Sequence, residues 1–260
     1  GKLRSSGASR LVFSEVENEL RALIEEFGPP RASSARPEFP FTRLEGKVWK
    51  LSKEVDKDSR SQLRDGVYGE FAPEVERALK DDEELGATLA RMLVANEFGE
   101  TQMRQVLIAT GLGDISFSDV SNNDGDAARK RSSSWPGQVL AMWNRTCAFC
   151  GYSGGLGAAA VGLEAAHVRW FNKGGPDELD NGLALCALDH SLLDSGVLGI
   201  TQDRRIKVSS HFIGPAGGAD RIFALQDRLL ARPKQVSAAT HIQHILWHDD
   251  QVFKSPAIAS

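Results

Sequence analysis

The sequence predicts an α+β protein with two domains: a mainly helical first domain with a short hairpin, and a second domain organised around cysteine and histidine residues. Three observations carry this prediction. Helical periodicity dominates residues 1–115, residues 116–134 are polar with almost nothing to bury, and closely spaced cysteines occur only in residues 135–260. With 260 residues, of which 41% are hydrophobic, the chain can form two packed cores. We therefore divide it into domains at 1–115 and 135–260 with a linker at 116–134.

The first domain opens with a helical pattern followed by an aromatic segment. Ser14 and Glu17 have the spacing of a capping box, and Gly28 followed by prolines predicts the end of this helix. Residues 37–51 are aromatic and β-prone around a Glu45-Gly46 turn, which predicts a short hairpin.

Helices are expected again in the second half of this domain. Residues 53–64 alternate in charge and indicate a solvated stretch. Helical patterns follow at 73–95 and 101–110, and a short break at 96–99 separates them. A further short helix at 135–143 is expected to lead into the second domain.

Composition excludes some classes of protein and leaves others open. No segment reaches the roughly 18 apolar residues of a membrane span, and the first residues lack an apolar secretory region. We expect a cytoplasmic protein, with natural residues before Gly1 because the chain does not begin with Met. The net charge of −4 gives no sign of nucleic-acid binding. DNA contact would need a local basic surface, because phosphate contacts act over about 8–10 Å.

Three cysteines, an odd number, argue against a disulfide framework, and their spacing favours a metal site. Cys147 and Cys150 form a Cys-x-x-Cys knuckle, which lets two thiolates reach one tetrahedral Zn²⁺. Cys186 and Asp189 have the same spacing and complete four ligands, although a carboxylate is a harder ligand than a thiolate. The alternative is a reduced, buried cysteine pair without metal.

Two histidines and an asparagine stand between and just after these pairs. A β-like run ends on His167, a Gly-Gly-Pro turn and Asn181 follow, and His190 lies at the start of a second helical stretch. Taken singly, each histidine also fits a purely structural role. A catalytic role is the alternative interpretation.

Residues 147–194 resemble the HNH nuclease domain, which has the ββα-metal fold, of the McrA-like kind in which a zinc knuckle braces the site. The resemblance rests on residues 163–167, on residues 181–190 and on their order along the chain, and residues 247–253 are similar to the ends of such restriction enzymes. It implies a metal-dependent DNA endonuclease that hydrolyses phosphodiester bonds.

The resemblance also implies roles for single residues. His167 is the expected general base, since an imidazole deprotonates water near neutral pH. Asn181 is expected to hold the base and the site loop, and His190 to bind Mg²⁺ or Mn²⁺, which would polarise the scissile phosphate. Two positions depart from the family pattern: Ala166 stands where many HNH sites have a metal-binding Asp, and Asp189 stands where this branch generally has His or Cys.

About residues 10–112 resemble the sulfur-binding domain of phosphorothioate-dependent restriction enzymes. The similarity rests on residues 12–17, 27–30 and 37–44 together with Trp49. It implies that the partner is double-stranded DNA carrying phosphorothioates. A non-bridging sulfur is larger and less hydrated than oxygen, so an apolar cup can accept it at a small desolvation cost.

The resemblance places candidate DNA contacts in this domain. The cup of the family is built around an aromatic–proline pair that corresponds here to Phe98 and Gly99, and Gly99 has no ring to offer. Arg36 and Arg43 are candidate phosphate contacts. The alternatives are a helix–helix turn with a buried Phe98, and surface arginines that are simply solvated.

Three functions are therefore open: a phosphorothioate-dependent HNH restriction endonuclease, an HNH nuclease without that requirement, and a DNA-binding protein with a degenerate site. One HNH module cuts one strand, so a double-strand break calls for a homodimer or two nicks. The basic cluster at 129–131 is a weaker candidate for phosphate contact. Packed or surface roles are favoured for the four late histidines: His211, His241, His244 and His248.

Overall fold

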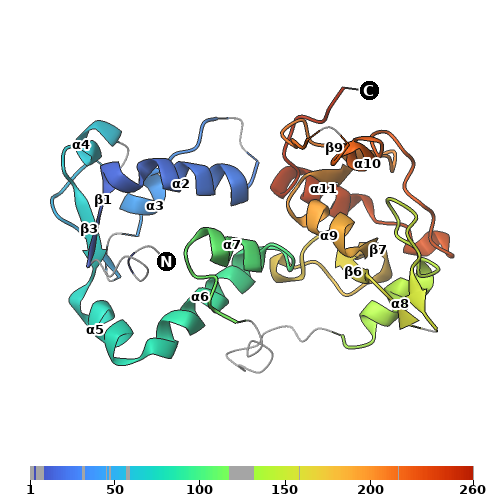
Figure 1. Cartoon of the computed structure of the whole chain (residues 1–260), viewed down its shortest axis with the longest axis horizontal. Coiled ribbons are helices and arrows are strands. Elements are labelled where there is room, and N and C mark those ends of the chain that lie inside the picture. Colours follow the sequence, from blue (N-terminus) through green and yellow to red (C-terminus); the bar gives the residue numbers. More distant parts are fainter. Residues whose placement is uncertain are drawn as a thin grey trace. The chain divides into compact units, whose positions relative to one another are not determined.

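The computed structural model describes residues 3, 9–30, 33–44, 46, 48–56, 59–116, 132–157, 159–215 and 217–259. Most of the predicted linker, including its basic cluster at 129–131, lies outside this set. The chain forms two compact units (Figure 1). The first comprises the described residues within 1–94 and 103–122, and the second those within 95–102 and 123–260.

The first unit is mainly helical. Its elements in order are β1 (Arg10–Val12), α2 (Phe13–Phe27), α3 (Glu38–Thr42), β2 (Trp49–Leu51), α4 (Arg60–Arg64), β3 (Tyr68–Phe71), α5 (Pro73–Asp81), α6 (Glu83–Glu97) and α7 (Met103–Ala109). The last residues of α6 belong to the second unit by their contacts.

A three-stranded antiparallel sheet of order β1-β3-β2 anchors the core of this unit. Its centre is a chain of edge-to-face aromatic contacts, with ring centroids 5.2 Å apart for Phe13 and Phe41 and 5.8 Å apart for Phe41 and Trp49. Such contacts add about 0.5–1.5 kcal/mol each to the burial of the rings. Leu63 is fully buried in the same cluster.

Two local predictions for this unit are wrong. Helix α2 begins at Phe13, and its N-cap is Val12 without a side-chain bond, so Ser14 lies inside the helix and forms no capping box. The reason is the strand before it, because β1 runs directly into the helix and the amide of Phe13 donates to Val67 O. Glu17 instead accepts from Arg64 at 2.6 Å.

The described residues within 37–51 do not form the predicted hairpin. Residues 38–42 form helix α3, whose apolar side is held by Phe41, and β2 pairs with β3 and not with its sequence neighbours. The stretch at 53–64, expected to be solvated, ends in helix α4 because Leu63 is drawn into the core.

Glu38 is a buried carboxylate held by two arginines. Its oxygens accept from Arg36 Nε at 2.8 Å and from Arg60 Nε at 2.7 Å. Burial alone would raise the pKa of Glu38, but the hydrogen bonds from Arg60 and Arg36 outweigh it and lower the pKa. The carboxylate therefore stabilises the fold above its unfolded-state pKa, near 4.5, and this contribution is lost as the pH falls through the lower folded-state pKa.

Glu38→Gln is expected to lower the free energy of unfolding of this unit by about 1–3 kcal/mol at pH 7, because two guanidinium groups lose their charged acceptor. The difference from the unmodified protein should shrink below pH 4. Calorimetric unfolding at both pH values measures it, with the exposed Glu74→Gln as the matched control. A penalty that does not change with pH would show that the ion pair is not its cause.

The second unit is an α+β arrangement of short elements. In order they are α8 (Trp135–Met142), β4 (Gly155–Leu156), β5 (Ala159–Ala160), β6 (Leu163–His167), the 3-10 helices η2 (Phe171–Lys173) and η3 (Leu179–Asn181), β7 (Gly182–Cys186), α9 (Ala187–Asp194), β8 (Leu198–Ile200), β9 (Ile206–Val208), α10 (Asp220–Phe223), η4 (Val236–Ala238) and α11 (Ile242–Gln251).

A hairpin followed by a helix forms the centre of this unit. Strands β6 and β7 pair antiparallel with His167 opposite Gly182 and Leu163 opposite Cys186. Helix α9 starts directly after β7 and packs on the hairpin, which α8 also contacts (Figure 1). The α+β fold predicted from the sequence is confirmed, and the register places Leu163, at the start of β6, opposite Cys186, after which α9 begins.

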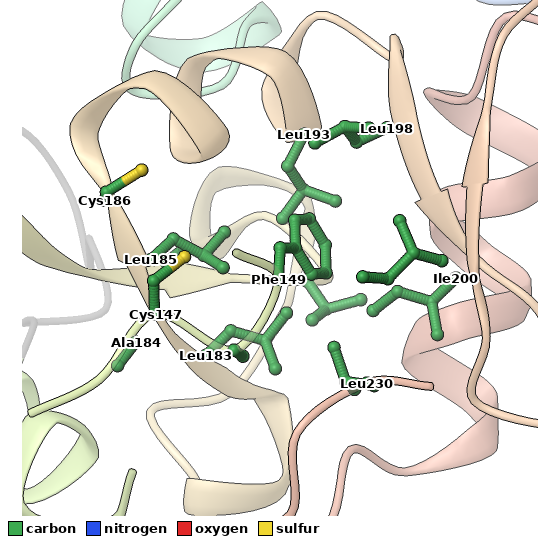
Figure 2. Packing of buried hydrophobic residues seen from close by; sticks show 14 of the residues in the cluster. Cys147, Phe149, Leu183, Ala184, Leu185, Cys186, Leu193, Leu198, Ile200 and Leu230 are labelled. Carbon is green, nitrogen blue, oxygen red and sulfur yellow. The ribbon is translucent and has the colours of Figure 1, made fainter. Parts of the chain in front are cut away.

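The core of this unit combines many aliphatic side chains with the buried rings of Trp135, Trp143 and Phe149. Figure 2 shows Phe149 surrounded by Leu183, Leu193 and Leu198, with the sulfur-bearing side chains of Cys147 and Cys186 at one side of the cluster. These leucines are fully buried, so the core fixes both strands and α9. None of the described helices has the length and apolar character to cross a membrane.

Candidate active site and metal cluster

The four residues predicted as zinc ligands come together. One ligand atom from each of Cys147, Cys150, Cys186 and Asp189 lies within 4.8 Å of the other three. The sulfurs of Cys150 and Cys186 are 3.8 Å apart, and Cys147 Sγ is 3.1 Å from Asp189 Oδ2. Thiolates bound to one tetrahedral Zn²⁺ at about 2.3 Å are about 3.8 Å apart, so the donor set fits such an ion.

Local structure explains how the knuckle brings its ligands together. Gly151 has φ +80°, a left-handed conformation that favours glycine, and its amide donates to Cys147 O at 3.0 Å. Cys186 ends β7 and Asp189 lies in the first turn of α9, so the strand–helix junction presents both. Burial is the main cause that raises the pKa of the thiols of Cys147 and Cys150.

Arg221 supports the cluster from α10. Its Nη2 lies 3.1 Å from Asp189 Oδ1 and 3.9 Å from Cys186 Sγ. Asp189 is fully buried, so the guanidinium supplies a charged partner for the carboxylate oxygen that faces away from Cys147. Three thiolates and a carboxylate around a divalent ion would leave a net charge of −2, which this cation reduces.

His167 lies at the end of β6 in a closely packed, polar setting. Its Nε2 is 2.8 Å from Asp177 Oδ1, and its ring stacks on Trp135 at 3.9 Å between centroids and 14° between planes. Asp177 also accepts from the amide of Ser132 at 2.6 Å. In a neutral ring, a carboxylate beside Nε2 favours the tautomer with its proton on Nε2.

Asn181 holds the loop between the two strands. Its Oδ1 accepts from the amide of Arg169 at 2.8 Å, and its Nδ2 donates to Arg169 O and Pro176 O, each at 3.0 Å. The side chain is fully buried, and a Cβ at Gly175 would stand 1.7 Å from Arg169 O. The conformation of this loop therefore depends on the side-chain amide of Asn181 and on glycine at position 175.

His190 lies on α9 between two carboxylates. Its Nδ1 is 2.7 Å from Glu164 Oε2, and its Nε2 is 3.6 Å from Asp194 Oδ2. Burial alone would lower the pKa of His190, but the hydrogen bond to Glu164 and the charges of Asp194 and Glu164 raise it. The hydrogen bond from His190 is the main cause that lowers the pKa of Glu164.

One pocket joins these groups. It has a volume of about 500 Å³, and its lining includes His167, Asp177, Glu164 and His190. Both imidazoles therefore face a shared space, with Asn181 fixing the loop behind His167. Glu100 and Thr101 also line this pocket.

The candidate DNA-contact residues fall into two groups. Arg36 and Arg43 both pack on the ring of Phe39, with Cζ 4.0 Å and 3.6 Å from its centroid, and so lie together in the first unit. Gly99 is buried in the second unit, where a Cβ would stand 2.8 Å from atoms of Trp170 and Asp194. Phe98 is half-buried there, and its carbonyl accepts from Asn172 Nδ2 at 2.8 Å.

Two of the late histidines are packed. His248 is buried and its Nε2 lies 3.0 Å from Leu193 O, and burial lowers the pKa of His248 to about 4. His244 is also buried, and burial is the main cause that lowers its pKa. His211 and His241 are exposed.

Sequence reasoning gave no role to four residues of these sites: Trp135, Glu164, Asp177 and Arg221. Trp135 and Arg221 lie far along the chain from the residues that they contact. Asp177 lies on a loop, where no spacing rule applies. The strand pattern could have pointed to Glu164. Side chains two residues apart on a strand lie on the same face, so Glu164 shares the face of Ala166, the residue before His167.

Two family models match parts of the chain. Residues 147–201, which lie in the second unit, match the HNH endonuclease family. Residues 1–115 match the ScoMcrA-like DNA sulfur-binding domain, so the chain joins a sulfur-binding domain to an HNH endonuclease domain.

The solved structures that match include one that is similar over part of the chain. It is described as a modification dependent TagI restriction endonuclease, with 24% sequence identity and a TM-score of 0.36. The similarity covers 45% of this chain and 37% of that one, so the chain spans well under half of that protein. No curated protein matches the sequence.

Proposed function

We propose that the protein is a modification-dependent DNA endonuclease, in which the first domain binds phosphorothioated double-stranded DNA and the HNH domain hydrolyses a phosphodiester bond. The observation that carries the proposal is the shared pocket of His167 and His190 in a domain of the HNH family. The match of residues 1–115 to a DNA sulfur-binding family supports the substrate.

In this proposal His167 is the general base. With Nε2 held by Asp177, Nδ1 takes a proton from the attacking water, and the stack on Trp135 keeps the ring in place. The carboxylate of Asp177 then stabilises the imidazolium that forms, as in other carboxylate–histidine pairs. Asn181 acts as a positioning residue through the three hydrogen bonds of its amide.

A hard divalent cation, Mg²⁺ or Mn²⁺, fits the imidazole and carboxylate donors around His190. When bound, such an ion polarises the scissile phosphate and neutralises the leaving oxygen. In the proposed structural site, Cys147, Cys150, Cys186 and Asp189 hold Zn²⁺ and thereby fix the start of α9, which carries His190.

A second candidate, an HNH nuclease that does not require phosphorothioate, is favoured by one observation. Gly99 corresponds to the sulfur cup of the family but is buried against Trp170 and Asp194. Arg36 and Arg43 would then bind phosphates on either kind of DNA, since phosphate contacts carry no information on modification by themselves.

Cleavage and binding assays on matched duplexes, with and without phosphorothioate and with and without Mn²⁺, test the proposal. We expect cleavage only with the cation, and affinity for the modified duplex at least about tenfold higher, equivalent to 1.4 kcal/mol. Equal affinities would support the sulfur-independent nuclease, and binding without cleavage at any cation concentration would favour a DNA-binding protein with a degenerate site.

A further inference from the structure

The position before the base has no metal-binding group in this chain. Ala166 is fully buried and carries no donor atom. A divalent cation held by His190 alone among protein groups would be weakly bound, because Mg²⁺ and Mn²⁺ favour oxygen ligands. A carboxylate close to His190 would supply the oxygen ligand that such an ion favours.

Glu164 is placed to do so by the geometry of β6. It lies two residues before Ala166, on the same face of the strand and about 6.6–6.8 Å away along it. Its oxygen approaches α9, since Oε2 lies 2.7 Å from His190 Nδ1.

The distance between these two atoms fits two ligands of one ion. Neighbouring ligands of an octahedral cation at about 2.1 Å are about 3 Å apart. Both Glu164 and His190 line the pocket that contains His167, so an ion between them would face the proposed base. The side chain of Glu164 is 47% exposed and can adjust toward an incoming ion.

Two of the other carboxylates that line the pocket or contact His190, Asp194 and Asp177, are engaged elsewhere. Asp194 Oδ2 accepts from the amide of Thr101 at 3.0 Å and from its hydroxyl at 2.7 Å, and Asp194 Oδ1 accepts from Trp170 Nε1 at 3.0 Å. Asp177 accepts from Ser132 and contacts His167. Both are held in these contacts, whereas the contact of Glu164 is with the proposed ligand itself.

We propose that Glu164 and His190 together bind the catalytic divalent cation, with Glu164 supplying the carboxylate ligand. This inference rests on the proposed function. It differs from a role in which Glu164 only orients the His190 ring by accepting a hydrogen bond. A glutamine at this position keeps an accepting oxygen but loses the charge and most of the affinity for a hard cation.

The test is Mn²⁺ binding to the zinc-loaded full chain without DNA, measured by titration calorimetry and electron paramagnetic resonance. Glu164→Gln should weaken Mn²⁺ binding about 10- to 100-fold, while Glu164→Asp should retain part of the affinity. Glu178→Gln, an exposed glutamate of the same unit, is the matched control and should bind Mn²⁺ like the unmodified chain. Zinc content and melting temperature of each variant show whether it is folded.

The outcomes separate this inference from the function on which it rests. If the unmodified chain binds no Mn²⁺ but cleaves DNA without added cation, the proposed metal dependence is wrong. If the unmodified chain binds Mn²⁺ and Glu164→Gln binds it equally well, Glu164 is not a ligand, although the nuclease proposal stands.

Discussion

His167→Ala is expected to reduce phosphodiester cleavage by about 10²- to 10⁴-fold, the usual contribution of a general base. The loss should appear in kcat and leave DNA affinity unchanged, because the DNA-binding residues proposed for the first domain, Arg36 and Arg43, are not altered. Single-turnover cleavage and equilibrium binding measure the two effects separately.

A second variant, Asp177→Asn, tests the carboxylate that contacts His167. Asp177→Asn keeps the volume of the side chain but can donate to Nε2, which would favour the tautomer with its proton on Nδ1. We expect kcat to fall at least about tenfold with little change in DNA affinity.

Controls for these variants are available in the same unit. His211→Ala removes an exposed histidine that contacts Ser255 O, away from the pocket lining, and should cleave normally. A His167→Ala protein that is folded and cleaves at the unmodified rate would show that another group activates the water.

Much of the second unit was predictable because its signals are local. The Cys-x-x-Cys spacing, a strand ending on His167 and a helix containing His190 can each be read from a few consecutive residues. The metal cluster follows from the same segments, since the junction of β7 with α9 fixes Cys186 and Asp189 within one turn.

The first unit was less predictable because its sheet is non-local. Strands of three or four residues are too short to show a period of two, and β2 finds its partner in β3 across helix α4. Phe39 and Phe41 have high β propensity, yet tertiary packing of Phe41 against Phe13 and Trp49 favours a helix there.

The partners of the site residues were also not predicted, because their contacts are non-local too. Trp135 stacks on His167 from 32 positions away, and Arg221 reaches Asp189 across 32 positions. No spacing rule links residues so far apart, and only the packing of α8 and α10 on the hairpin and α9 brings them together.

Asp189→Ala is expected to lower zinc affinity by at least about 100-fold and to destabilise the second unit. The variant removes one of four proposed ligands and leaves Arg221 and the thiol of Cys147 without their carboxylate partner. Because the free energy of binding a structural zinc ion is also folding free energy, its loss should lower the melting temperature as well as the zinc content.

Asp189→Cys restores a thiolate donor and should bind zinc, whereas the exposed Asp203→Ala should have no effect on either measurement. Zinc stoichiometry by elemental analysis and calorimetric melting provide the data, and an unchanged stoichiometry in Asp189→Ala would remove this residue from the ligand set.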